Sequence, residues 1–179
     1  MPQKVDAYIG LGSNIDPETN ILRTVELLQG SPERHCEVIN VSTFYRCPAV
    51  GPAKGQSDFI NGIVHIRTEL TAEQLKYDFL RPLEFELGRA LNEEKYTPRC
   101  MDLDIIFYAD EIHQTSRLKI PAQDLYERNF VYIPLLEISP SIIDPRSRKA
   151  VSEAIPSLDH QMQSFELPSQ DFAQISLSL

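Results

Sequence analysis

Residues 98–108 read PRCMDLDIIFY. The second half of this stretch, 102–108, is rich in isoleucine and aromatic residues and is therefore predicted to be a β-strand. Because successive side chains of a strand point to opposite faces, Asp102 and Asp104 are expected on one face, about 6 to 7 Å apart at the backbone. The opposite, buried face is expected to carry three apolar side chains: Leu103, Ile105 and Phe107.

The aspartate pair predicts a metal site. Two neighbouring carboxylates repel each other unless a positive charge lies between them. Mg²⁺ suits that place because it takes oxygen ligands and is often shared between carboxylates and substrate phosphates. Arg99 lies close in the sequence, and its planar guanidinium can hold phosphate oxygens. The alternative is a solvated acidic face on which Arg99 only balances Asp102.

Outward from this strand, the hydrophobic pattern predicts three more strands and two long helices. The strands are 7–11, 38–44 and 59–66. The first helix begins at Asp16 and Pro17, as N-cap and first helical residue. The second begins at a capping box of Thr71 and Gln74 and runs to about Gly88, with a kink expected at Pro82. A short helical stretch is expected near 130–138.

The order strand–helix–strand–strand–helix–strand is that of an α+β, ferredoxin-like βαββαβ sandwich, with an antiparallel sheet and helices on one face. We expect one domain over residues 1–155 and a C-terminal tail over 156–179, which is rich in Ser and Gln. Residues 47–57, rich in Pro and Gly, are predicted to form a long functional loop, mobile until substrates bind.

The charge excludes several classes of partner. With 17 basic and 26 acidic residues, the net charge of −9 repels nucleic acid and anionic lipid. A polyanionic substrate therefore needs a local basic cluster, for which Arg89, Lys95 and Arg99 are available. The chain has no P-loop, no metal-binding cysteine spacing and no apolar run of membrane-spanning length. We expect a cytoplasmic monomer that binds neither nucleic acid nor membrane.

Four stretches, taken in order, resemble the 6-hydroxymethyl-7,8-dihydropterin pyrophosphokinase family of folate biosynthesis. They are AYIGLGSN at 7–14; FYRCP at 44–48 with GP at 51–52 and DFIN at 58–61; Glu84, Gly88 and Arg89 with the PR and DLD of 98–104; and RNF at 128–130 with PL at 134–135. The resemblance covers about 7–140, roughly three quarters of the chain.

The resemblance implies a ferredoxin-like fold and transfer of the β,γ-diphosphate of MgATP to a pterin hydroxymethyl group, with release of AMP. It implies two Mg²⁺ ions on Asp102 and Asp104, with Arg89 and Arg99 as further catalytic residues. The implied pterin-binding residues are Cys47, Pro48, Val50, Phe59, Asn61 and Phe130, with Phe130 stacking on the pterin and Asn61 pairing with its edge. The implied ATP-binding residues are Glu84, Arg89, Tyr96, Arg99, Ile105, Arg117, Lys119 and Arg128.

Three positions depart from the family pattern: Leu91 replaces an arginine, Tyr96 a tryptophan and Ala122 a histidine. The implied roles of these positions concern the nucleotide, so weaker ATP binding or a different grip through Arg117 or Lys119 is expected. Two alternatives stay open. One is a paralogue that binds pterin or nucleotide without catalysis or with altered specificity. The other is a structural adaptor whose acidic strand only keeps it in solution.

Overall fold

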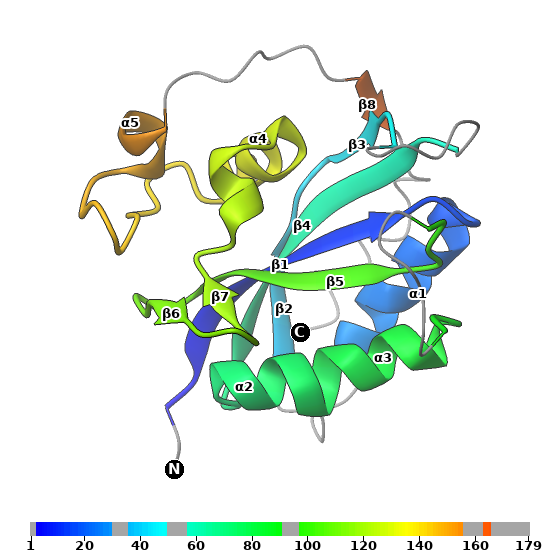
Figure 1. Ribbon diagram of the computed structural model, residues 1–179, viewed down its shortest axis with the longest axis horizontal. Coiled ribbons are helices and arrows are strands. Elements are labelled where there is room, and N and C mark those ends of the chain that lie inside the picture. Colours follow the sequence, from blue (N-terminus) through cyan, green and yellow to red (C-terminus); the bar gives the residue numbers. More distant parts are fainter. Residues whose placement is uncertain (1–2, 30–35, 50–56, 91–96, 156–162, 166–179) are drawn as a thin grey trace.

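A computed structural model of the chain describes residues 3–29, 36–49, 57–90, 97–155 and 163–165. Its main feature is a six-stranded antiparallel sheet with strand order β5-β1-β4-β3-β8, in which β2 also pairs with β4 (Figure 1). The strands are β1 (Val5–Ser13), β2 (Cys36–Val41), β3 (Phe44–Cys47), β4 (Phe59–Thr68), β5 (Asp102–Tyr108) and β8 (Gln163–Phe165). A separate two-stranded ribbon joins β6 (His113–Gln114) to β7 (Lys119–Ile120).

Helices cover both faces of the sheet. On one face lie α1 (Pro17–Gln29) and a continuous helical run of α2 (Ala72–Gln74), π-helix η2 (Leu75–Leu80) and α3 (Arg81–Glu86) (Figure 1). The 3₁₀ helix η3 (Gln123–Tyr126) and α4 (Asn129–Ile138) pack on the other face, and α5 (Val151–Ala154) contributes to the same cluster. The two long helices of the βαββαβ order thus share a face, which confirms the predicted ferredoxin-like fold. No helix among the described residues is both long enough and apolar enough to cross a membrane.

The side-chain alternation of the strands separates two cores. Ala7, Ile9 and Leu11 of β1 point toward α1 and the α2–α3 run, whereas Tyr8 points toward α4. Because β1 pairs with both β4 and β5, residues paired with it on these strands point to the same faces of the sheet.

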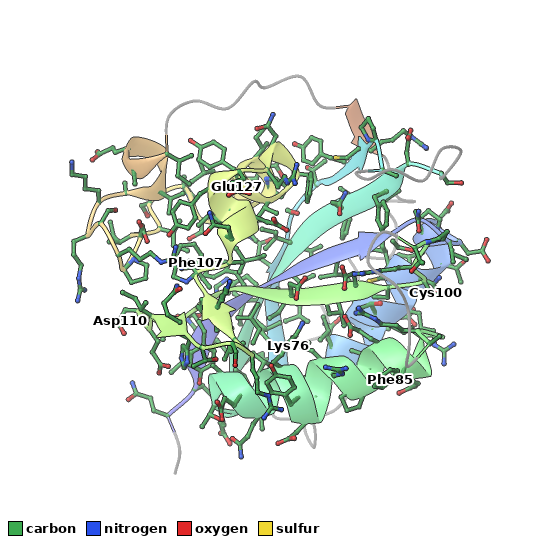
Figure 2. All side chains as sticks on the ribbon, viewed as in Figure 1. Lys76, Phe85, Cys100, Phe107, Asp110 and Glu127 are labelled. Atoms are coloured by element: carbon green, nitrogen blue, oxygen red, sulfur yellow. The ribbon has the colours of Figure 1, made fainter. Side chains whose placement is uncertain are left out.

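Phe107 lies on the opposite face from the one predicted for it. The pairing of β1 with β5 shifts register between Tyr8 and Ile9, which leaves Ile106 as a β-bulge. A bulge adds one residue to a strand and reverses the alternation beyond it. Leu103 and Ile105 therefore join the core under α1, as predicted, while Phe107 joins the α4 core (Figure 2).

The predicted strand over 38–44 is two strands. The chain breaks between β2 and β3 at Ser42, whose backbone N–H donates to the Ile63 carbonyl at 2.9 Å. The Ser42 hydroxyl accepts the Ile63 N–H at 2.8 Å. The serine side chain thus replaces a backbone acceptor at the break, so β4 continues past it without an unpaired group.

The helical boundaries agree closely with the sequence patterns. Thr71 and Gln74 form the predicted capping box, each side chain bonding the other's backbone N–H. Pro82 has no N–H for an α-helical bond, and the helix is π-helical up to Leu80, two residues before it. The disturbance expected from Pro82 is therefore a wider helical turn. Within the predicted tail, Gln163–Phe165 pairs with β3; the rest of the tail lies outside the described residues.

Gly62→Ala is expected to destabilise the sheet. The Phe44 ring covers Gly62 so closely that an added Cβ would lie 2.6 Å from two ring carbons. Overpacking of this kind costs about 1–3 kcal/mol in free energy of unfolding, measurable by urea denaturation. In a Phe44→Leu background the same substitution should cost less. An equal cost in both backgrounds would contradict the proposed clash.

Candidate active site

A cavity of about 690 Å³ opens over the strands β1, β4 and β5. It is bounded by the start of β5, the turn before β7, and the η3–α4 segment. Of the residues predicted to bind substrate or metal, twelve line it: Cys47, Pro48, Phe59, Asn61, Arg99, Asp102, Asp104, Ile105, Arg117, Lys119, Arg128 and Phe130. Residues far apart in the sequence are therefore brought to one cavity. Val50 and Tyr96, and residues 50–56 of the predicted loop, lie outside the described residues.

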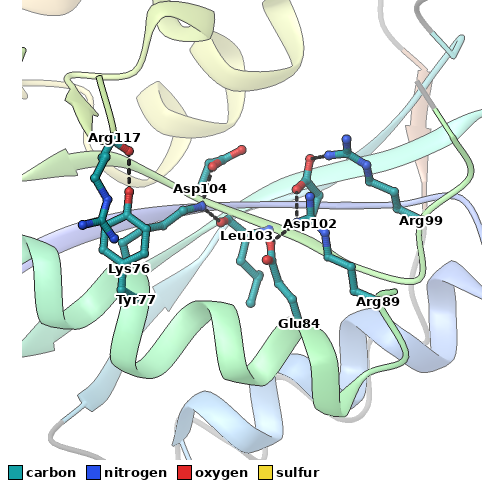
Figure 3. A network of polar contacts seen from close by, with 9 residues as sticks. All are labelled: Lys76, Tyr77, Glu84, Arg89, Arg99, Asp102, Leu103, Asp104 and Arg117. Carbon is teal, nitrogen blue, oxygen red and sulfur yellow. Dashed lines mark hydrogen bonds and ion pairs between the residues drawn. The ribbon is translucent and has the colours of Figure 1, made fainter. Parts of the chain in front are cut away.

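Asp102 is held between two arginines. Its Oδ1 accepts from Nη1 of Arg89 at 2.9 Å, and its Oδ2 accepts from Nη1 of Arg99 at 2.6 Å (Figure 3). The carboxylate is 28% exposed, so these charge-assisted bonds are only partly screened by water. Arg99, in the loop before β5, and Arg89, three residues after the end of α3, thus converge on the same strand residue.

Asp104 has a different partner, Lys76 of η2. The ammonium of Lys76 donates to Oδ1 of Asp104 at 2.7 Å and to the Leu103 carbonyl at 2.6 Å (Figure 3). Desolvation opposes ionisation of Asp104, but the charges of Lys76, Arg89 and Arg99 outweigh it and lower its pKa. Lys76 was not predicted from the sequence, because a lysine on a helix with several exposed polar positions is ordinarily interpreted as solvent-facing.

Glu84 does not line the cavity; it supports the residues that do. Its side chain is 3% exposed, and its Oε1 accepts from the Leu103 N–H and from Arg89, both at 2.7 Å. Arg89 likewise lies behind the cavity wall and reaches the site through Asp102. Burial raises the pKa of Glu84 to about 7, against the opposing influence of the Leu103 N–H, Lys76 and Arg89.

The end of β1 positions the loop that carries Arg99. The Asn14 side chain accepts the Arg99 N–H at 2.7 Å, and the Asn14 N–H donates back to the Arg99 carbonyl at 3.1 Å. The buried Ser13 hydroxyl donates to the Cys100 carbonyl at 2.6 Å. The GLGSN turn therefore fixes the backbone on both sides of the Arg99 Cα.

The β4 side of the cavity is mainly apolar. Phe59, Pro48, Cys47 and Phe130 line it, and burial raises the pKa of the Cys47 thiol, which keeps it neutral. Asn61 supplies an amide in these surroundings. Its Oδ1 lies 2.8 Å from the point where a Cβ on Gly12 would be, so a side chain at position 12 would have to displace the amide.

Tyr77, beside Lys76 on η2, holds Arg117. The Tyr77 hydroxyl donates to the Arg117 carbonyl, and the Arg117 guanidinium lies 4.6 Å from the centre of the Tyr77 ring. This stacking fixes a guanidinium beside the cavity. The cavity also contains acidic groups that the sequence analysis did not single out, Asp124 and Glu127. Desolvation and the nearby carboxylates, chiefly that of Asp104, raise the pKa of Asp124.

A family model described as 7,8-dihydro-6-hydroxymethylpterin-pyrophosphokinase (HPPK) matches residues 8–140. The chain belongs to this family. The match spans every predicted site residue and all the residues that line the cavity. The resemblance read from the residues is thereby confirmed.

Individual HPPK relatives match over most of the chain. The 2-amino-4-hydroxy-6-hydroxymethyldihydropteridine pyrophosphokinase of Synechocystis sp. is 38% identical over 157 residues, which is 86% of this chain and 76% of that protein. The enzyme of the same name from Haemophilus influenzae is 35% identical over 158 residues, covering 88% of this chain and 96% of that protein. The folic acid synthesis protein fol1 of Schizosaccharomyces pombe is 34% identical over 155 residues, 21% of its length.

Glu84→Gln is expected to flatten the pH dependence of stability. In the folded protein Glu84 stays protonated up to about pH 7, against an ordinary pKa of 4.5. Between these values the folded state binds the extra proton, so the free energy of unfolding falls as pH rises. From pH 5 to pH 8 the wild type should lose about 2 to 3 kcal/mol more than the variant in urea unfolding. Parallel pH curves for the two proteins would refute this.

Proposed function

We propose that this chain transfers the β,γ-diphosphate of ATP to the hydroxymethyl group of 6-hydroxymethyl-7,8-dihydropterin and releases AMP. The observation that carries the proposal is the placement of an apolar wall with one amide, Asn61, next to the Asp102–Asp104 pair and its basic residues, in a single cavity. A flat heteroaromatic ring suits the first part and a triphosphate suits the second. The names of the HPPK relatives describe the same reaction.

In this reaction the pterin hydroxyl oxygen attacks the β-phosphorus of ATP. The bond between that phosphorus and the oxygen bridging it to the α-phosphorus breaks, AMP carries away the bond's electrons, and the hydroxyl proton passes to solvent. The protein needs no covalent intermediate for this. Its task is to align two substrates and to neutralise charge on the transferring group.

Arg99 is the residue best placed to neutralise that charge. It lines the cavity, its backbone is fixed by Asn14, and its guanidinium already binds an oxygen anion, the Asp102 carboxylate. A guanidinium can hold phosphate oxygens in the same planar geometry. Arg89 acts from behind Asp102, and Glu84 holds Arg89 in place.

Asp102 and Asp104 fit magnesium. Both supply carboxylate oxygens, both line the cavity, and their positions on β5 put them on the same face of the strand. When bound, two magnesium ions would supply positive charge to the phosphate oxygens. The carboxylates would hold these ions in the part of the cavity nearest Arg99.

The pterin is proposed to lie against the β4 side. Phe130 provides an aromatic face, and the Asn61 amide offers both a donor and an acceptor to a ring edge. Cys47, Pro48 and Phe59 enclose the ring on the apolar side. The closeness of Asn61 to Gly12 fixes the amide and therefore the orientation of the ring.

The nucleotide is proposed to lie toward β7 and the segment between η3 and α4 that carries Arg128. Arg117, Lys119 and Arg128 line that side of the cavity and offer positive charge to the triphosphate, and Ile105 offers an apolar contact. Ala122 also lines it, where the family pattern has histidine. Because Tyr77 fixes Arg117, this guanidinium is the best candidate to take over the missing contact.

The identity of the nucleotide product tests the proposal. Incubation with 6-hydroxymethyl-7,8-dihydropterin and MgATP should yield AMP in equal amount to the pterin diphosphate, as measured by chromatography. Formation of ADP, or binding of both substrates with no AMP, would overturn it and leave a different transferase or a non-catalytic binder.

Asp102→Asn and Asp104→Asn should each lower kcat by about 100-fold or more, because each removes a negative metal ligand while keeping the side-chain volume. Asp110→Asn is the matched control, because this exposed aspartate follows the far end of β5 (Figure 2). Circular dichroism should show the same folded spectrum for all three variants. Full activity in either active-site variant would contradict the assigned metal role.

Gly12→Ala should weaken pterin binding selectively. The new methyl group would displace the Asn61 amide, from which it would be 2.8 Å away. We expect KM for the pterin to rise about tenfold, roughly the loss of one hydrogen bond, with KM for ATP little changed. Asn61→Ala should have the same effect, and the double variant no further one. Additive losses would show that Gly12 acts by another route.

A further inference from the structure

The π-helix η2 places a lysine at the metal-binding carboxylates. Lys76 is the second residue of η2, and π-helical turns within α-helices occur frequently at functional sites. Its side chain is only 18% exposed, and its ammonium bonds both the Leu103 carbonyl and the Asp104 carboxylate (Figure 3). The bond to Leu103 fixes the ammonium beside Asp104.

Each carboxylate of the metal-binding pair already has a basic partner: Lys76 for Asp104, and Arg89 and Arg99 for Asp102. We define the inner cluster as Lys76, Glu84, Arg89, Arg99, Asp102 and Asp104. It contains three acidic and three basic side chains, in ion pairs of 2.6 to 2.9 Å. Because the pKa of Glu84 is raised to about 7, the basic charges of the cluster at least balance its acidic charges at neutral pH. A bare divalent cation that approaches Asp104 therefore meets a carboxylate that is already paired with an ammonium, and this ammonium repels the cation.

We propose that Lys76 competes with divalent metal for Asp104, so that metal binds tightly there only together with the nucleotide. This inference rests on the proposed function. In it Lys76 touches neither substrate and acts through the Asp104 carboxylate that it holds. The ammonium holds Asp104 in the nucleotide-free protein. The triphosphate then brings the negative charge that makes an added cation favourable despite Lys76, Arg89 and Arg99.

A purely structural role for Lys76 predicts something else. The bond to the Leu103 carbonyl alone would attach η2 to the edge of β5, and its loss would lower stability without changing metal affinity. The second bond, to Asp104 at 2.7 Å, is what links the lysine to the metal site. Metal binding measured without nucleotide separates the two roles.

The experiment is calorimetric titration of the full chain with Mn²⁺ alone, used as a magnesium probe. Lys76→Met should bind Mn²⁺ at least tenfold more tightly than the wild type, since the competing charge is gone. Lys76→Arg, which keeps the charge, should resemble the wild type. Lys119→Met is the matched control, because it removes an exposed positive charge from the same cavity, and should change the affinity less than threefold.

Equal affinities in the wild type and Lys76→Met would overturn the inference, as would equal gains in Lys76→Met and Lys119→Met. Should Lys76→Met fail to fold by circular dichroism, Lys76→Gln provides the same comparison. A second titration, with Mn²⁺ and a non-hydrolysable ATP analogue, tests the underlying site. Failure of the wild type to bind that complex would count against the proposed function, whereas its binding with unchanged bare-metal affinities would count only against Lys76.

Discussion

The backbone of Leu103 is the point on which the site depends. It lies on β5 at one edge of the sheet, where no further strand pairs with it in the described part of the chain. Side chains of the neighbouring helical run replace that strand: Glu84 accepts the Leu103 N–H, and Lys76 donates to its carbonyl. An edge strand with its polar groups satisfied in this way is fixed in position. Asp102 and Asp104, the residues on either side, are fixed with it.

The same principle of satisfying backbone groups connects two distant stretches of sequence. Ser13 and Asn14 end β1, and their side chains bond the backbone of Arg99 and Cys100. The polar turn after the first strand therefore belongs to the active site although it contributes no catalytic group. Chain segments nearly ninety residues apart act together because one supplies hydrogen bonds that the other needs.

Much of this could be predicted from the sequence. Strand alternation placed Asp102 and Asp104 on one face, and hydrophobic periodicity with the Thr71 capping box located the two long helices. The reversal at Phe107 could not be predicted, because the bulge arises from the pairing of β5 with β1. Lys76 and Tyr77 were missed for a related reason: a polar residue on a helix is ordinarily interpreted as solvent-facing. Only the packing of η2 against β5 shows otherwise.

The short strand β8 has a consequence for the other edge of the sheet. By pairing with β3 it occupies backbone groups that would otherwise face solvent on a strand of four residues. Exposed edges of this kind are templates for association with strands of other molecules. The edge of the sheet therefore passes from β3 to β8, whose three residues offer only a short template to another strand, at the end of the sheet opposite Asp102 and Asp104.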